Sequence, residues 1–148
     1  MKSFLFPDVN VWLALAHNRH SQHITAKGWF EAEAERPVFF CRFTQLGLLR
    51  LLTNSQVMGR DVVSQREAWR AYDRMFEDSR IEFLHEPGGP DVEMHFRNLS
   101  SRSQPSTKIW ADAYLAAFAR SAGLTIVTFD RALRSTAGPE VIVLGDVE

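Results

Sequence analysis

The chain has 148 residues, of which 45% are hydrophobic and 24% charged, and its formal net charge is −1. This length and composition fit one globular domain over residues 1–148 and argue against a disordered or fibrous protein. The near-neutral charge argues against broad coating of nucleic acid, although a local basic rim remains compatible with it. No apolar run is long enough to cross a membrane, and the single cysteine, Cys41, cannot form an internal disulfide. We therefore expect a reducing cytoplasm and no membrane contact.

Apolar periodicity predicts strands that alternate with helices along the chain. The expected elements, in chain order, are a strand at 2–7, helices at 9–16 and 21–35, a strand at 38–41, helices at 43–54 and 64–78, a strand at 81–84, helices at 91–99 and 110–122, a strand at 124–129, a short helix or turn at 131–136 and a strand at 141–144. The polar stretch 100–106 is expected to be a loop. Alternation of this kind favours an α/β fold with a parallel sheet.

Acidic residues stand at the ends of two predicted strands. Asp8 follows the first strand and Asp130 follows the strand at 124–129, so both are expected at the carboxyl edge of the sheet, where sites form in such folds. Asp112 lies in the first turns of the preceding helix and can reach the same edge. Three neighbouring carboxylates repel one another, and Mg²⁺ or Mn²⁺ relieves this repulsion. Such an ion activates water and stabilises charge on a phosphate oxygen.

Each of these aspartates also has a simpler interpretation. Asp8 and Asp130 precede predicted helices, where an aspartate caps the first turn by accepting a backbone hydrogen bond. Asp112 fits a solvated helix face equally well. The spacing of the acids therefore leaves both a joint metal site and separate structural roles open.

Five segments resemble motifs of the PIN-domain family, in the family's order and over nearly the whole chain. Residues Phe6–Ala16 resemble the first motif, in which a strand delivers an aspartate. Residues Trp110–Ala119 resemble the third motif, and Thr128–Asp130 resembles the Thr/Ser-x-Asp motif that follows it. Residues 20–29 and 41–54 are similar to one toxin subgroup. No single motif is specific, but the set of them is.

The resemblance implies a VapC-like toxin ribonuclease of a type II toxin–antitoxin pair. Such a protein has a three-layer α/β/α fold with a central, mostly parallel sheet of about five strands. It is a Mg²⁺- or Mn²⁺-dependent endoribonuclease that cuts tRNA or rRNA, typically as a homodimer, and a VapB-like antitoxin neutralises it. On this chain, Asp8, Asp112 and Asp130 become the catalytic metal ligands, Thr128 orients Asp130 or a metal-bound water, and Asn10 supports the ligands.

The second motif departs from the family pattern. PIN domains usually carry a glutamate there, and the aligned residue here is Gln45, which keeps an oxygen acceptor but lacks the charge. The departure implies weaker metal binding or a single metal ion. It also favours an alternative, a catalytically weak or inactive PIN-like binding module that acts through its antitoxin. A metal-dependent phosphatase is disfavoured, because Asn10 stands where that chemistry often needs a second acid.

Several cationic and aromatic residues are further candidates. Three arginines near the motifs suit RNA phosphates through their planar guanidinium, with surface salt bridges as the alternative: Arg42, Arg50 and Arg131. The histidines have no nearby acid or cysteine pair to complete a zinc site, which favours capping, packing or substrate contact: His17, His20 and His23. The tryptophans could stack on bases, but core or dimer-interface positions are favoured: Trp12, Trp29, Trp69 and Trp110.

Overall fold

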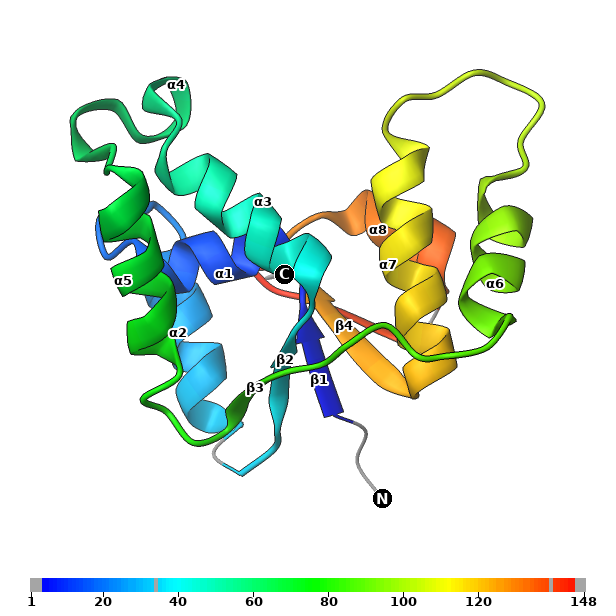
Figure 1. Ribbon diagram of the computed structural model, residues 1–148, viewed down its shortest axis with the longest axis horizontal. Helices are drawn as coiled ribbons and strands as arrows, with labels where there is room; N and C mark the ends of the chain where they lie inside the picture. The colour runs from blue at the N-terminus through cyan, green and yellow to red at the C-terminus, as the bar shows by residue number, and fades with distance from the viewer. Residues whose placement is uncertain (1–3, 34, 139, 146–148) are drawn as a thin grey trace.

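The computed structural model describes residues 4–33, 35–138 and 140–145. Its centre is a five-stranded sheet in the order β3-β2-β1-β4-β5, and every neighbouring pair is parallel (Figure 1). The strands are β1 (Phe4–Pro7), β2 (Val38–Phe40), β3 (Ile81–Phe83), β4 (Leu124–Thr128) and β5 (Val141–Val143). The α/β class and the parallel sheet expected from the sequence are confirmed. Residues 2 and 3 of the first predicted strand lie outside the described residues.

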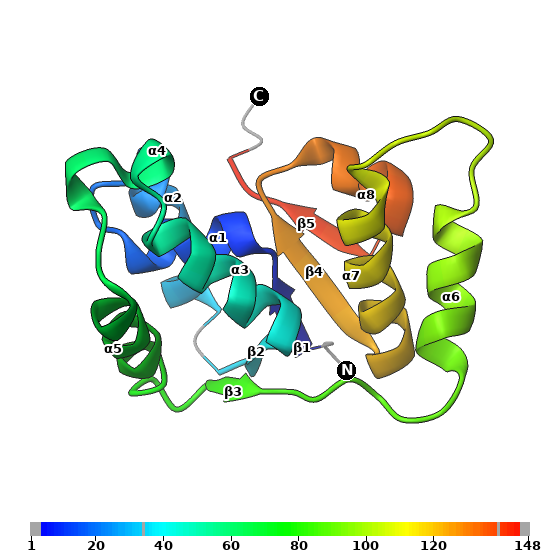
Figure 2. The same cartoon turned by 45° about the horizontal axis from the view of Figure 1, so that its top comes forward.

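Helices cover both faces of the sheet, with α1–α5 on one side and α6–α8 on the other (Figures 1 and 2). They are α1 (Val9–Ala16), α2 (His23–Ala32), α3 (Arg42–Leu52), α4 (Ser55–Met58), the 3₁₀ turn η1 (Gly59–Asp61), α5 (Gln65–Met75), α6 (Asp91–Ser100), α7 (Ile109–Ala122) and α8 (Arg131–Ala137). The three expected layers are therefore present. No helix in the described part of the chain is both long and apolar enough to pass through a membrane.

Two details of the helices differ from the sequence prediction. Helix α2 runs over His23–Ala32 rather than 21–35, so its predicted start and end are both wrong, and residue 34 lies outside the described residues. The α4–η1 segment was not predicted, because helices of four and three residues are too short to show a hydrophobic period. Helix α4 depends on a local cap, in which the Asn54 side chain accepts a hydrogen bond from the Gln56 amide at 2.9 Å.

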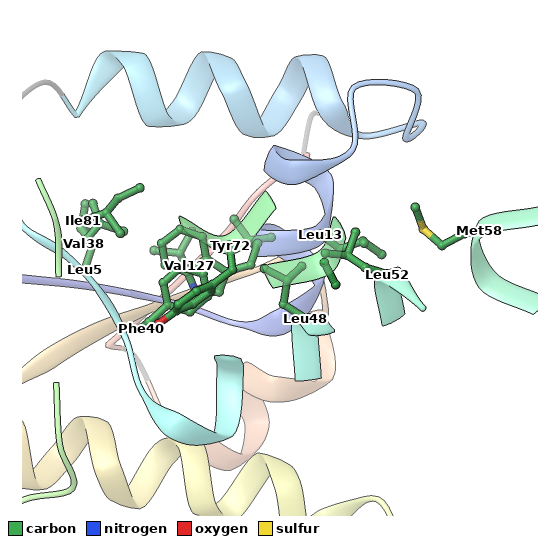
Figure 3. Packing of buried hydrophobic residues seen from close by; sticks show 13 residues of the cluster. Leu5, Leu13, Val38, Phe40, Leu48, Leu52, Met58, Tyr72, Ile81 and Val127 are labelled. Atoms are coloured by element: carbon green, nitrogen blue, oxygen red, sulfur yellow. The ribbon is translucent and has the colours of Figure 1, made fainter. Parts of the chain in front are cut away.

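The first hydrophobic cluster lies between the sheet and α1, α3, α4 and α5. Alternate strand residues point into it, among them Leu5 of β1 and Phe40 of β2 (Figure 3). The fully buried Trp12 stacks on Phe40 with ring centroids 3.7 Å apart, and Tyr72 packs edge-on against the same ring. Removing a buried aromatic side chain of this kind costs about 3–5 kcal/mol, so this cluster holds α1 in place behind Asp8.

The second cluster lies on the opposite face, under α7 and α8. It takes the intervening strand residues, such as Phe6 of β1 and Ile126 of β4, and Phe118 of α7 stacks on Phe6 at 4.9 Å. Both faces of β1 and β4 are therefore buried. This explains why the central strands read as continuous apolar runs rather than as alternating ones.

Close contact between α1 and α3 requires a glycine. A Cβ atom placed on Gly47 would lie 2.6 Å from a methyl group of Val9, closer than packed atoms tolerate. Gly47 thus lets α3 pass directly over the residue that follows Asp8. At the other side of the sheet, Gly123 ends α7 in the left-handed conformation, with φ of 70°.

The four tryptophans divide into two groups. Trp12 is fully buried and Trp29 packs against the first cluster, as the sequence favours. Trp69 and Trp110 are not core residues, because 47% and 57% of them are exposed, and a dimer-interface position for these two stays a prediction. They lie on outward faces of α5 and α7, which the sequence period does not distinguish from inward ones.

Candidate active site

Asp8 and Thr128 meet where β1 and β4 end. These strands are parallel neighbours, with Pro7 opposite Val127, and the Asp8 amide donates to the Val127 carbonyl at 2.8 Å. Asp8 therefore leaves β1 beside Thr128, the last residue of β4. The register of two buried strands, rather than a loop, fixes this side of the site.

The Thr128 hydroxyl joins three polar residues. It donates to Asp8 Oδ2 at 3.0 Å and accepts from the Asp130 amide at 3.0 Å and from Asn10 Nδ2 at 3.3 Å. The Asn10 amide oxygen accepts from the Phe129 amide at 3.3 Å, which ties α1 to the residue before Asp130. Thr128 is fully buried, so its one donor and both acceptor positions are used within the protein.

The two strand-end aspartates are also helix caps. Asp8 Oδ1 accepts from the Val9 amide at 2.7 Å at the start of α1, and Asp130 Oδ1 accepts from the Ala132 amide at 2.9 Å at the start of α8. The capping roles that the sequence left open are therefore real. They do not compete with a joint site, because each carboxylate directs its other oxygen elsewhere: that of Asp8 to Thr128, and that of Asp130 to Lys108 Nζ, 3.3 Å away.

Asp112 joins this group from the first turn of α7. Its pKa is raised by burial and then by the charges of Asp130 and Asp8, while Lys108 and Arg102 act in the opposite direction. Burial also raises the pKa of Asp8, to which the Asp130 charge adds, against hydrogen bonds from Val9 and Thr128 and the charge of Lys108. The structure thus brings the three predicted aspartates into one electrostatic neighbourhood.

The donor set fits a hard divalent cation in its chemistry. It consists of carboxylate oxygens, which Mg²⁺ and Mn²⁺ prefer, and their mutual repulsion is what a cation would remove. Among the described residues, no three histidine, cysteine or acidic side chains already form a ready-made cage for an ion. The cap hydrogen bonds and Lys108 hold the carboxylates of Asp8 and Asp130 in their present rotamers.

Gln45 has a different set of partners. It is buried in the first turns of α3, where its Oε1 accepts from Arg42 Nη1 at 2.6 Å and its side chain hydrogen-bonds to Tyr72 of α5. Arg42 in turn lies over the Phe83 ring, 4.8 Å from its centroid. These contacts direct the Gln45 amide toward α5, while the hydrogen bonds of the carboxylate group run through Thr128.

The remaining predicted residues lie at separate places. Arg50 is exposed in the last turn of α3, beside a cleft that Trp69 also lines, and Arg131 is the exposed first residue of α8. The histidines have individual partners, as the structural interpretation expects: His17 lies 3.4 Å from Asp61, His20 accepts from the Gln22 amide, and His23 contacts the Ala14 carbonyl.

Two basic residues near the carboxylates were missed by the sequence analysis. Lys108 pairs with Asp130, and Arg102 is close enough to Asp112 to lower its pKa. Arg102 lies within the polar stretch 100–106 that was predicted only as a loop, and Lys108 follows that stretch. The sequence could have indicated Lys108, because it stands one helical turn before Asp112. The helix was expected to begin only at Trp110, so the two residues were not placed on the same helix face.

Comparison with known proteins identifies the class to which this fold and site belong. Residues 5–139 match the PIN domain, and the chain therefore belongs to the PIN-domain family. It is 41% identical over 145 residues to Ribonuclease VapC41 of Mycobacterium tuberculosis, a match that covers 95% of this chain and 98% of that protein. These findings confirm the VapC-like ribonuclease class that the motifs predict.

Solved structures show the same fold. VapC20 of M. tuberculosis, described as a sarcin-ricin loop cleaving toxin, aligns with a TM-score of 0.64 at 21% identity and covers 90% of this chain and 95% of its own. VapBC2 from Rickettsia felis, solved bound to a promoter DNA fragment, aligns with a TM-score of 0.66 at 12% identity and covers 95% and 96%. At these identities the likeness establishes the fold alone.

Proposed function

We propose that this protein is a Mg²⁺- or Mn²⁺-dependent endoribonuclease that cleaves tRNA or rRNA as the toxin of a toxin–antitoxin pair. The observation that carries the proposal is the link between Asp8 and Asp130 through the buried Thr128 hydroxyl at the carboxyl edge of the sheet, with Asp112 in the first turn of α7 within range of both charges. The 41% identity to Ribonuclease VapC41 over nearly the whole chain supports the same activity.

The chain's own residues have distinct tasks in this proposal. Asp8, Asp112 and Asp130 hold the ion, and Thr128 fixes Asp8 through its 3.0 Å hydrogen bond. Asn10 supports Thr128 and the backbone before Asp130. When bound, the divalent ion supplies a water of lowered pKa and stabilises charge on the phosphate oxygens. Lys108, whose exposed ammonium lies 3.3 Å from Asp130, would be available to contact an RNA phosphate at the site.

The proposed partners are an antitoxin, a second copy of the chain and RNA. A VapB-like antitoxin is the proposed inhibitor, because the structural neighbours include toxin–antitoxin complexes such as VapBC2 from Rickettsia felis. We further propose a homodimer in the cytoplasm, with Arg42, Arg50 and Arg131 as contacts to RNA phosphates. Because Arg42 holds the Gln45 side chain, Asp8, Asp112 and Asp130 are the three carboxylates proposed for the site, which favours a single metal ion.

The test compares induction of the wild type with induction of Asp8→Asn in bacteria, with new RNA 5′ ends mapped across all transcripts. Asparagine caps a helix about as well as aspartate, so α1 and the fold survive while the charge is lost. Asp91→Asn, at an exposed first-turn position of α6, is the matched control. Circular dichroism of the purified proteins verifies that all three are folded.

Discrete new ends in tRNA or rRNA with the wild type and with Asp91→Asn, and their absence with Asp8→Asn, are the expected result. New ends that persist with Asp8→Asn would contradict the proposed site. No new ends from a folded wild type would contradict the nuclease. The inactive binding module would then be favoured, with the missing acid at Gln45 as its physical reason.

A further inference from the structure

A cleft opens between the end of α6 and the start of α7, under the loop that joins them. Both helices and the connecting loop are visible side by side in Figure 2. The cleft has a volume of about 530 Å³, within the range of about 300–1,000 Å³ usual for small-ligand pockets. Its lining combines aromatic, cationic and amide side chains, among them Phe96, Arg97, Arg102, Gln104 and Trp110.

The aromatic wall has a free surface. Trp110 contacts Phe96 edge to face, with ring centroids 6.1 Å apart and planes at 67°, yet 57% of Trp110 remains exposed. Because the Trp110 indole is exposed, the folded chain lacks the hydrophobic stabilisation that burial of a tryptophan normally gives. Such a surface suits a flat ring, and nucleic-acid bases stack on aromatic side chains with little dependence on sequence.

The polar wall contains one arginine that is bound to a carboxylate and one that has a neutral partner. Arg97 pairs with Glu93 at 2.8 Å, so its charge is balanced within α6. Arg102 Nη2 donates to the Thr136 hydroxyl of α8 at 3.3 Å, and its charge also lowers the pKa of Asp112. Arg102 therefore stands between the cleft and the carboxylates, where a guanidinium can meet a phosphate.

The cleft and the carboxylate group are both built on α7 and on the loop that precedes it. The loop that lines the cleft ends at Lys108, which pairs with Asp130 at 3.3 Å. The first turn of α7 then places Trp110 in the cleft and Asp112, two residues later, in the carboxylate group. Trp110 and Asp112 are two residues apart and so point to different sides of α7. Arg102 connects the two places, because it lines the cleft and donates to Thr136 of α8, the helix that Asp130 caps.

We propose that this cleft binds a nucleotide of single-stranded RNA next to the scissile phosphate, with its base against Trp110 and its phosphate at Arg102. The inference rests on the proposed ribonuclease function and deepens it. It implies that the substrate is recognised as an unpaired segment, because a base must leave its stack to enter the cleft.

The test measures RNA affinity in the Asp8→Asn background, which removes cleavage. The probe is a short fluorescein-labelled single-stranded RNA of randomised sequence, followed by anisotropy. Trp110→Ala is expected to weaken binding about tenfold, in line with the loss of one stacked base, and Trp110→Phe to restore most of it. Phe4→Ala is the control, because Phe4 is an aromatic residue that is also 47% exposed but stands at the start of β1, at the edge of the sheet opposite the carboxylates.

The phosphate half of the proposal has its own measurement. Arg102→Ala is expected to weaken binding and to reduce the slope of log affinity against log salt by about one, whereas Arg102→Lys keeps the slope. Arg120→Ala is the control, because Arg120 is exposed in the last turn of α7, at the end of the helix away from the cleft, and it is expected to keep the slope as well.

Two failures are distinguishable. If the wild type cleaves RNA but Trp110→Ala binds it as tightly as Phe4→Ala does, the cleft is not a nucleotide site and only this inference is contradicted. If the wild type neither cleaves nor binds RNA, both the proposed function and this inference are contradicted.

Discussion

Three strand-to-helix junctions lie side by side along one edge of the sheet, and they differ in what they carry. The β1–α1 and β4–α8 junctions are each capped by an aspartate, Asp8 and Asp130, and Thr128 joins the two. The β2–α3 junction, next to β1, is capped by Cys41 and Thr44 instead. There the Cys41 amide donates to the Thr44 hydroxyl at 3.0 Å, and both residues are buried.

The difference shows that one backbone geometry serves two purposes. At two junctions the helix begins at a carboxylate, and the carboxylates repel one another. This repulsion destabilises the folded protein unless a cation is bound between them. At the third junction the same position is filled by small, nearly neutral groups that satisfy each other. Gln45, one turn further along α3, continues this local pattern through its bonds to Arg42 and Tyr72.

The largest expected effect follows from removal of the link between the charged junctions. Thr128→Val keeps the side-chain shape but removes the hydroxyl that donates to Asp8 and accepts from the Asp130 amide. Initial rates of RNA cleavage at saturating Mg²⁺ should fall about 10–100-fold, the usual cost of losing a group that orients metal ligands. Thr128→Ser should recover most of the rate. A Thr128→Val rate within twofold of the wild type would contradict the role of the hydroxyl.

A moderate effect is expected on stability. The folded-state pKa of Asp112 is raised, so its carboxylate costs stability at neutral pH, and this cost disappears as the pH falls through the raised pKa. In a chelator, Asp112→Asn should melt about 2–4 °C higher than the wild type at pH 7, a shift equivalent to about 1 kcal/mol. The gap should close by about pH 4, the unfolded-state value. A less stable variant at pH 7 would show that Asp112 is not repelled by its neighbours.

The smallest effect is expected at the third junction. Gln45→Glu places a carboxylate beside the Arg42 guanidinium, whose Nη1 already contacts this side chain at 2.6 Å. The new charge should pair with Arg42, and the Kd for Mn²⁺, measured by calorimetry, should change by less than about threefold. A tenfold tightening would instead place residue 45 within the metal site, as the family pattern implies.

The sequence was most informative where backbone geometry alone decides the outcome. Asp8 and Asp130 were predicted at the same edge because parallel strands deliver their ends together, and the structure places them there. The sequence does not predict contacts that depend on the direction in which a side chain points. It could not show that Gln45 turns to Tyr72, or that Arg102, within the polar stretch 100–106, and Lys108, just after it, approach the carboxylates.

Direct metal binding tests the central claim most simply. Mn²⁺ is titrated into the wild type and into Asp130→Asn, and the free ion is followed by its electron paramagnetic resonance signal. The account predicts saturable binding to the wild type and at least about tenfold weaker binding to Asp130→Asn, whose cap is preserved but whose charge is lost. Equal binding to the two proteins, or none to either, would contradict a metal site built from these carboxylates.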